Sequence, residues 1–122
     1  MDREEFQART KRLALRVIRL VEALPRSTTA SVIGRQVLRS ATSVGANHRA
    51  ACRARSTADM IAKLKIVEEE ADETLYWLEL LVEGGVMPSA RLGPLIVETD
   101  EIVAMTVASI RTLRRGQRSR RS

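Results

Sequence analysis

Arginines recur at helical spacing between positions 35 and 55. With a threonine and an alanine, they form one stripe of a predicted helix: Arg35, Arg39, Thr42, Ala46, Arg49 and Arg53. The adjacent stripe is small throughout: Gly34, Ala41, Gly45 and Cys52. A guanidinium group suits phosphate because its planar fork donates two parallel hydrogen bonds. The segment therefore predicts a close-packed assembly that handles an anion, with nucleic acid as the best-fitting class.

Two further groups of arginines extend the basic character. One row lies on the expected first helix: Arg9, Arg12, Arg16 and Arg19. A second group lies near the carboxyl end: Arg114, Arg115, Arg118, Arg120 and Arg121. Contacts to phosphate supply affinity but little sequence information. Aromatic residues make up only 2% of the chain, which disfavours stacking of single-stranded bases. The expected ligand is therefore structured RNA or a duplex, bound by its backbone with steep salt dependence.

The net charge of +6 conceals an uneven distribution. Residues 1–55 carry 12 basic and 4 acidic side chains, residues 56–110 carry 3 and 11, and residues 111–122 carry 6 and none. The arginines either pair with the acidic third helix, within one subunit or between subunits, or they bind a polyanion. Pairing explains the basic tail less well, because that tail has no acidic neighbour in the sequence.

Catalytic and metal chemistry find little support. His48 and Cys52 are four residues apart on one helix, but a triad also needs an orienting carboxylate and an oxyanion hole. Di-metal bundles need two Glu-x-x-His motifs, and the single histidine is preceded by Gly45 at that spacing. We therefore expect no catalytic residues, no metal and no cofactor. Glu68 falls in the apolar stripe of the third helix, and we expect it to be buried and paired with arginine.

The apolar spacing predicts four amphipathic helices, with Pro25 ending the first and Gly84-Gly85 closing the third. Ser27, Thr28 or Thr29 is expected to cap the second helix, and Ser56 or Thr57 the third. The fourth helix either begins at Pro94 or is kinked there. The predicted helices cover residues 3–24, 30–55, 57–83 and 89–115, forming one domain over 1–115, and 116–122 is expected to be a disordered basic tail.

Short loops between such helices predict an all-α, up-down-up-down four-helix bundle. Helices of 20–28 residues would be about 30–42 Å long, so the bundle is elongated. Another helix is expected to cross near Gly45, where a glycine inside a helix permits close approach. The apolar faces of the first and fourth helices are wider than one bundle needs, which predicts a homo-oligomer.

The expected compartment is the cytoplasm. The chain has one cysteine, so an intramolecular disulfide is impossible, and its amino terminus lacks the apolar segment of a signal peptide. No stretch approaches the roughly 18 apolar residues of a membrane span. We therefore expect no membrane association.

Two small groups of residues leave their roles open. Ser40, Ser43 and Asn47 share one helical neighbourhood, and they either form hydrogen bonds between helices or make a polar patch on the functional surface. Tyr76 and Trp77 are adjacent and point about 100° apart, so both cannot face the core. The exposed ring is a candidate subunit contact, and partial burial of both is the alternative.

Residues 36–47 read QVLRSATSVGAN, and with this stretch the second helix resembles the four-helix-bundle family of 23S rRNA intervening-sequence proteins. The family stretch Q-x-x-R-S-x-x-S-[IV]-x-x-N is matched by Gln36, Arg39, Ser40, Ser43, Val44 and Asn47. Similarity continues through RAACRARS at 49–56, KL at 63–64, EEEADE at 68–73 and YWLE at 76–79. The common branch follows its asparagine with Ile-Ala-Glu-Gly, whereas this chain has His-Arg-Ala-Ala at 48–51. A role that rests on that glutamate is therefore not transferred.

The resemblance implies a cytoplasmic, bacterial four-helix bundle that assembles as a ring, typically a homopentamer, and no enzymatic activity. Gln36, Arg39, Ser40, Ser43 and Asn47 are the residues that carry the family motif. Relatives include the accessory variability determinant of diversity-generating retroelements, which binds nucleic acid and a reverse transcriptase through basic surfaces. Two functions follow as hypotheses: a non-enzymatic nucleic-acid binder, or a structural adaptor that scaffolds a protein such as a reverse transcriptase.

Overall fold

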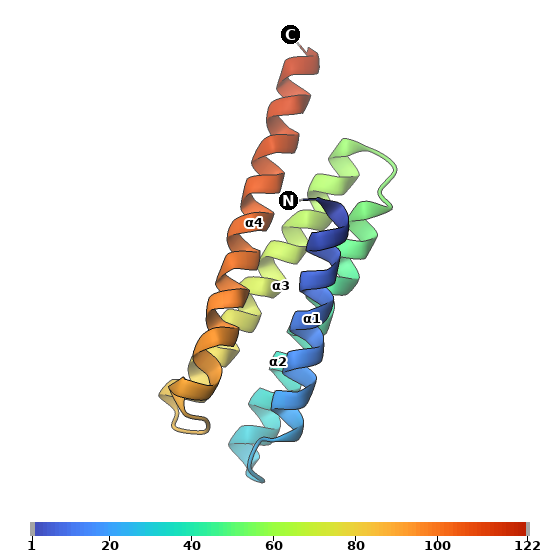
Figure 1. Cartoon of the computed structure of the whole chain (residues 1–122). Helices are drawn as coiled ribbons and strands as arrows, with labels where there is room; N and C mark the ends of the chain where they lie inside the picture. The colour runs from blue at the N-terminus through green and yellow to red at the C-terminus, as the bar shows by residue number, and fades with distance from the viewer. Residues whose placement is uncertain (1, 122) are drawn as a thin grey trace.

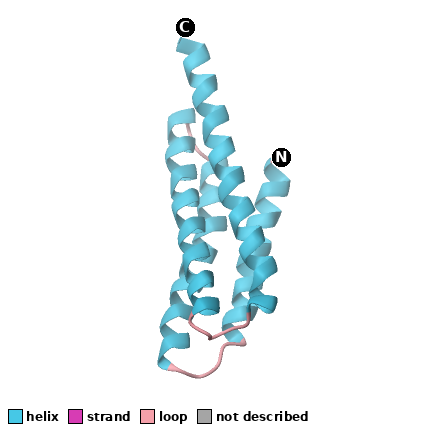
Figure 2. Cartoon of the chain, turned by 90° about the vertical axis from the view of Figure 1, so that its left-hand side faces the viewer, coloured by secondary structure: helices cyan, strands magenta, loops and turns pink. Residues whose placement is uncertain are grey.

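Four α-helices account for nearly all of the chain. The computed structural model describes residues 2–121, and no strand occurs among them (Figures 1 and 2). The helices are α1 (Arg3–Glu22), α2 (Thr28–Cys52), α3 (Thr57–Glu83) and α4 (Ser89–Arg121). The all-α class predicted from the sequence is confirmed, and none of the four helices is long and apolar enough to cross a membrane.

Polar side chains define where the first three helices begin. Asp2, Ser27 and Ser56 each accept a hydrogen bond from a backbone N–H three residues ahead, at 2.7, 3.0 and 3.1 Å. These bonds satisfy donors that have no partner within the first turn of a helix. After α3, Gly85 adopts φ +72°, a conformation that glycine reaches without steric cost. Both predicted serine caps and the glycine end of the third helix are confirmed.

The core is aliphatic and continuous along the helices. Its fully buried side chains come from every helix and include Leu13, Val17, Val37, Val44, Val67, Leu78, Leu81 and Ile102. A Cβ added at Gly45 would lie 3.5 Å from the carbonyl oxygen of Thr10, an ordinary contact distance, so α1 passes close to α2 at this glycine. The crossing expected at Gly45 is therefore confirmed.

Neighbouring helices in the sequence are also neighbours in space. α2 packs closely on both α1 and α3, and α3 packs on α4, whereas α1 and α4 touch only sparsely. The three connecting loops lie at alternating ends of the molecule (Figure 1). The interface between α1 and α4 is consequently the most open one; it holds one of the hollows described below and borders a second, which all four helices line.

The carboxyl end differs from the sequence prediction. α4 starts at Ser89, keeps Pro94 inside the helix and continues to Arg121, projecting past the other helices (Figures 1 and 2). The prediction that residues 116–122 are disordered is wrong for 116–121, and Ser122 lies outside the described residues. A helix that has already formed extends at low cost, and arginine and glutamine favour it. Arg120 adds a hydrogen bond of 3.3 Å to Thr57 of α3.

Candidate nucleic-acid interface

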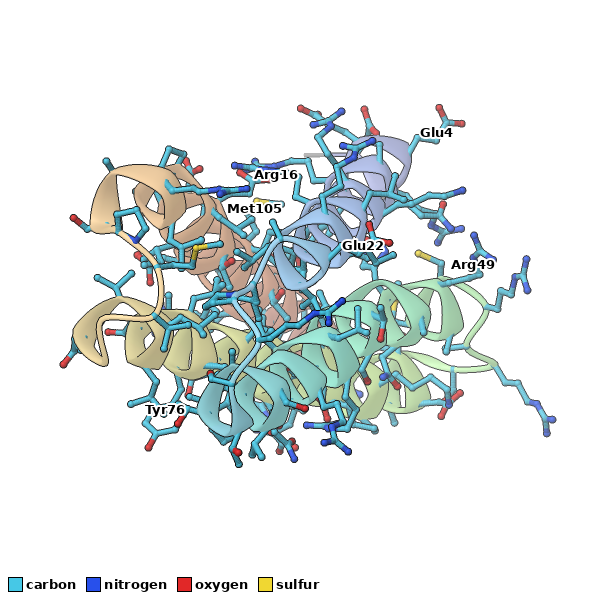
Figure 3. The ribbon with its side chains drawn as sticks, turned by 90° about the horizontal axis from the view of Figure 1, so that it is seen from below. Glu4, Arg16, Glu22, Arg49, Tyr76 and Met105 are labelled. Atoms are coloured by element: carbon cyan, nitrogen blue, oxygen red, sulfur yellow. The ribbon has the colours of Figure 1, made fainter. Side chains whose placement is uncertain are left out.

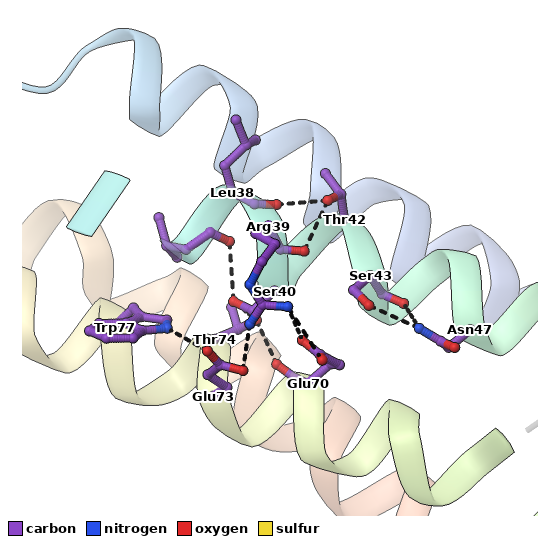
Figure 4. Close-up of polar contacts among 11 residues, drawn as sticks. Leu38, Arg39, Ser40, Thr42, Ser43, Asn47, Glu70, Glu73, Thr74 and Trp77 are labelled. Atoms are coloured by element: carbon purple, nitrogen blue, oxygen red, sulfur yellow. Dashed lines mark hydrogen bonds and ion pairs between the residues drawn. The ribbon is translucent and has the colours of Figure 1, made fainter. Parts of the chain in front are cut away.

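The predicted arginine stripe of α2 lies on the surface, as Arg35, Arg39, Arg49 and Arg53 are all exposed. Arg39 differs from the others because its guanidinium reaches α3. It donates to Glu70 at 3.2 Å and lies 2.6 Å from Glu73 (Figure 4). The hydrogen bond from Arg39 holds the pKa of the Glu73 carboxyl below its ordinary value.

Arg9 is also held by carboxylates, but they come from α4. Its Nε donates to Glu98 at 3.0 Å, and a second nitrogen lies 3.3 Å from Glu101. The hydrogen bond from Arg9 lowers the pKa of Glu98, although burial of that carboxyl acts in the opposite direction. A third bond joins the guanidinium to the sulfur of Met105 at 3.2 Å. Arg9 thus fastens α1 to α4.

The remaining arginines of α1 and α2 are not neutralised in this way. Within residues 2–121, ion pairs involve only two of the predicted arginines of these helices, and the following six have none: Arg12, Arg16, Arg19, Arg35, Arg49 and Arg53. Arg35 donates instead to Ser31 on its own helix. Glu68, expected to be buried and paired, is only half-buried because Val67 occupies the core position, and Glu70 pairs with arginine instead.

A groove of about 310 Å³ lies between α1 and α2, and we call it the α1–α2 groove. Lys11 lines its α1 side and Arg49 lines its α2 side. Small or polar residues form the rest of the groove: Gln7, Thr10, Ala14, Thr42, Gly45 and Ala46. The small and cationic stripes of α2 therefore meet in one concave surface. Lys11 was missed by sequence reasoning because it lies on the far side of α1 from the arginine row.

A second hollow, of about 220 Å³, lies between α1 and α4. Its cationic residues are Arg16 and Arg19 from α1 and Arg91 from α4, and its apolar residues are Leu20, Leu92 and Leu95. Arg16 lies in the space between these two helices when the bundle is seen from below (Figure 3). Arg91 was not among the predicted residues, since it stands alone on its helix and only the fold brings it to α1.

The carboxyl-terminal arginines extend along the projecting end of α4. Arg114, Arg115, Arg118 and Arg120 are exposed, and Arg111 precedes them on the same helix. Positions 111, 114, 115 and 118 follow the spacing of one helical stripe, whereas position 120 lies on the opposite side. Arg121 ends the helix, and its side chain lies outside the described residues.

Two residues of the family-like motif, Arg39 and Ser40, contact α3. The hydroxyls of Ser40 and Thr74 are 2.8 Å apart and fully buried, and Ser40 also donates to the carbonyl of Val37 (Figure 4). Asn47 instead bonds to Ser43 on its own helix, at 2.9 Å. Of the two alternatives, the interhelical hydrogen bond is thus found at Ser40 only. Gln36 is half-buried on the same helix.

His48 and Cys52 border a third pocket, of about 460 Å³, at the end of the bundle where α1 begins. His48 is buried and stacks on Phe6 with ring centroids 4.2 Å apart, and the Cys52 sulfur lies 3.9 Å from its ring nitrogens. Burial, with a smaller contribution from Arg3, lowers the pKa of His48. Among residues 2–121, no cluster of three histidine, cysteine or acidic side chains could hold a metal ion.

The sequence of the chain matches a protein-family model. The model of the 23S rRNA-intervening sequence protein matches residues 4–108, which is most of the chain. The chain belongs to that family. The match ends before the arginines at the end of α4, so those residues lie beyond the part that the 23S rRNA-intervening sequence proteins share. No curated protein matches the chain.

A solved structure supports the assignment. It is the crystal structure of a protein of unknown function from the S23 ribosomal protein family of Bacteroides thetaiotaomicron. The two chains share 35% sequence identity and superpose with a TM-score of 0.81. The similarity covers 86% of this chain and 97% of the other. Membership of the 23S rRNA-intervening sequence protein family is therefore supported by fold and sequence together.

Proposed function

We propose that the protein is a non-enzymatic binder of nucleic acid that holds the backbone of structured RNA or duplex in the α1–α2 groove. The observation that carries the proposal is the placement of Lys11 and Arg49 on opposite sides of a concave surface without an acidic lining residue. Arg35 and Arg53 extend the same face along α2. A phosphodiester backbone in the groove would meet cations from both helices.

The chemistry of the groove favours backbone recognition over base recognition. Its lining contains no aromatic ring, so bases have no surface on which to stack. Lysine and arginine neutralise phosphates and release counterions, which makes binding strong at low salt and weak at high salt. Gly45 and Ala46 keep the groove open for the backbone to approach.

We propose further that the bundle, in the up-down-up-down topology, forms a homo-oligomeric ring, with a pentamer as the expected size. Large apolar side chains that one copy leaves exposed would supply the contacts: Leu15, Ile18, Val32, Ile66, Tyr76 and Val97. Tyr76 points away from the bundle and is 55% exposed, whereas Trp77 is half-buried (Figure 3). A ring would repeat the α1–α2 groove and raise affinity through avidity. Light scattering coupled to size exclusion measures the copy number.

The experiment compares two double variants in a gel-shift titration with a hairpin RNA at low salt. Lys11→Gln/Arg49→Gln removes the two cations of the groove. Arg26→Gln/Lys65→Gln removes two exposed cations elsewhere and serves as the matched control. We expect the groove variant to lose at least about tenfold in affinity and about two units of salt slope, while the control changes little. Equal losses in both variants would argue against the groove.

The alternative is an adaptor whose basic surface scaffolds a partner protein such as a reverse transcriptase. Size exclusion and pull-down with and without nuclease separate the two functions. A co-purifying nucleic acid that disappears on nuclease treatment supports the proposal. Undetectable binding of structured RNA at low salt, together with a protein partner that survives nuclease, would replace it with the adaptor.

A further inference from the structure

The hollow between α1 and α4 gathers three arginines that the α1–α2 groove does not use. Arg16, Arg19 and Arg91 line it, and in the described part of the chain none of them forms an ion pair. Three buried leucines complete the lining: Leu20, Leu92 and Leu95. Guanidinium groups that face one small hollow repel each other, although Arg19 and Arg91 are exposed to water and only Arg16 is half-buried.

Elsewhere in the α1–α4 interface, carboxylates of α4 balance the charge of an arginine of α1. Towards the amino end of α1, Glu98 and Glu101 of α4 neutralise Arg9. In the hollow, α4 contributes Arg91 where an acidic residue would balance the arginines of α1. The first turn of α4 also lacks an acidic residue, so the positive end of its helix dipole adds to the local potential. Glu98 is close enough to Arg16 for this arginine to help lower the pKa of the carboxyl, but no carboxylate lines the hollow itself.

We propose that this hollow is a binding site for a phosphate dianion, held by the guanidinium groups of Arg16, Arg19 and Arg91. A phosphate monoester carries a charge of about −1.5 to −2 at neutral pH and offers three acceptor oxygens, which suits three cationic donors. A phosphodiester inside a strand carries only one charge. The hollow, at about 220 Å³, has room for a phosphate group with the first atoms attached to it.

Two sources could deliver such a group: free phosphate, or the phosphorylated 5′ end of an RNA strand. Both present the same oxygens to the arginines. The proposal does not depend on the α1–α2 groove, because Lys11 and Arg49 lie outside this hollow. Failure of one site is therefore distinguishable from failure of the other.

Thermal unfolding in inorganic phosphate, compared with sodium chloride at the same ionic strength, tests the site itself. We expect phosphate to raise the thermal unfolding midpoint of the wild-type protein. The Arg91→Gln variant should bind phosphate at least about tenfold more weakly than the wild type. Arg91→Lys keeps the charge but loses the planar, two-pronged guanidinium group, so we expect an intermediate affinity for phosphate. Arg114→Gln makes the same change on the same helix away from the hollow, and it should bind phosphate like the wild type.

Circular dichroism before each titration confirms that the variants fold. No stabilisation by phosphate beyond that of chloride in the wild-type protein would overturn the proposal. Equal stabilisation of the wild type, Arg91→Gln and Arg114→Gln would also overturn it, because the effect would then be general to the basic surface.

A second titration identifies the source of the phosphate. One hairpin RNA is prepared with a 5′-phosphate and with a 5′-hydroxyl, and the ratio of the two affinities is measured. A ratio above one that falls to one in Arg91→Gln, but not in Lys11→Gln/Arg49→Gln, assigns the site to a strand end. A ratio of one in every variant, with phosphate binding retained, assigns it to free phosphate. A ratio above one that Arg91→Gln leaves unchanged contradicts the site.

Discussion

The α2–α3 interface and the α1–α4 interface are built in opposite ways. Between α2 and α3, buried hydroxyls of Ser40 and Thr74 meet at 2.8 Å, and Arg39 closes the outer edge by pairing with carboxylates of α3. Between α1 and α4 the contact is sparse. Arg9 pairs with Glu98 across it, the arginine-lined hollow lies between the two helices, and the 460 Å³ pocket, which all four helices line, borders it.

The two interfaces differ in which residues form them: motif residues at one, and cations outside the motif at the other. Ser40 and Arg39, which carry the resemblance to the family, hold the closed interface together, so they report on architecture. The cations without ion pairs line the open interface and the α1–α2 groove, where a ligand can reach them. Family membership therefore identifies the scaffold, and the residues that line both proposed sites lie outside the motif.

The largest expected effect on stability comes from shortening a buried leucine at each of the two interfaces. Leu78→Ala, at a fully buried position of α3, should lower the free energy of unfolding by about 3–5 kcal/mol, because the closed interface cannot collapse around the cavity. Leu95→Ala, on the lining of the arginine hollow, should cost only about 1–2 kcal/mol because water can enter. Urea unfolding measures both, and equal costs would contradict the contrast between the interfaces.

The buried hydroxyl pair gives the next effect. Ser40→Ala or Thr74→Val alone should destabilise the protein by about 0.5–1.5 kcal/mol, since each removes the interhelical bond while the remaining hydroxyl keeps a bond to a carbonyl of its own helix. The double variant should cost less than the sum of the two single changes. A double-mutant cycle by urea unfolding measures that coupling. Additive costs would show that the hydroxyls act independently.

His48 predicts a pH dependence at the pocket end of the open interface. Its pKa in the folded protein lies below the ordinary value of 6.5, so the unfolded chain binds the proton more readily. The contribution of His48 to stability should be fully present above the ordinary value and should be lost as pH falls below it towards the folded-state pKa. His48→Gln should flatten the curve in this window. The carboxylates with lowered pKa, such as Glu98, should act only at more acidic pH.

The two arginine pairs give the smallest effects and compare the interfaces directly. Arg9→Gln should cost about 1 kcal/mol, because its side chain and that of Glu98 are only 22% and 18% exposed. Arg39→Gln should cost less than about 0.5 kcal/mol, since Arg39 is 50% exposed and water screens its pairs. Thermal unfolding at two salt concentrations checks the order, and a larger loss at Arg39 would reverse it.

Much of the scaffold could be predicted because its signals are local. Ser27, Ser56 and Gly85 mark helix ends within a few residues, and Gly45 predicts the crossing without any knowledge of the other helix. The tail was misjudged because its composition was considered alone, although α4 had already nucleated a helix that it could extend.

The candidate sites were harder to predict because they combine residues from two helices. A stripe on one helix groups only its own residues, so Lys11 and Arg91 had no visible connection to the arginine rows. The pairing of Arg9 with α4 and of Arg39 with α3 depends on how each helix is rotated in the bundle. That rotation follows from the packing of all four helices together, and no single segment specifies it.

The position of the single tryptophan has an optical consequence. The indole Nε1 of Trp77 donates to Glu73 at 3.2 Å, and that carboxylate also binds Arg39. Its emission should therefore respond mainly to opening between α2 and α3, whereas far-ultraviolet dichroism averages over every helix. Recorded together during denaturation, the two signals would coincide if the bundle unfolds in one step. They would separate if α1 detaches first from its sparsely packed neighbour α4, so wild-type protein already carries the probe that resolves the order of events.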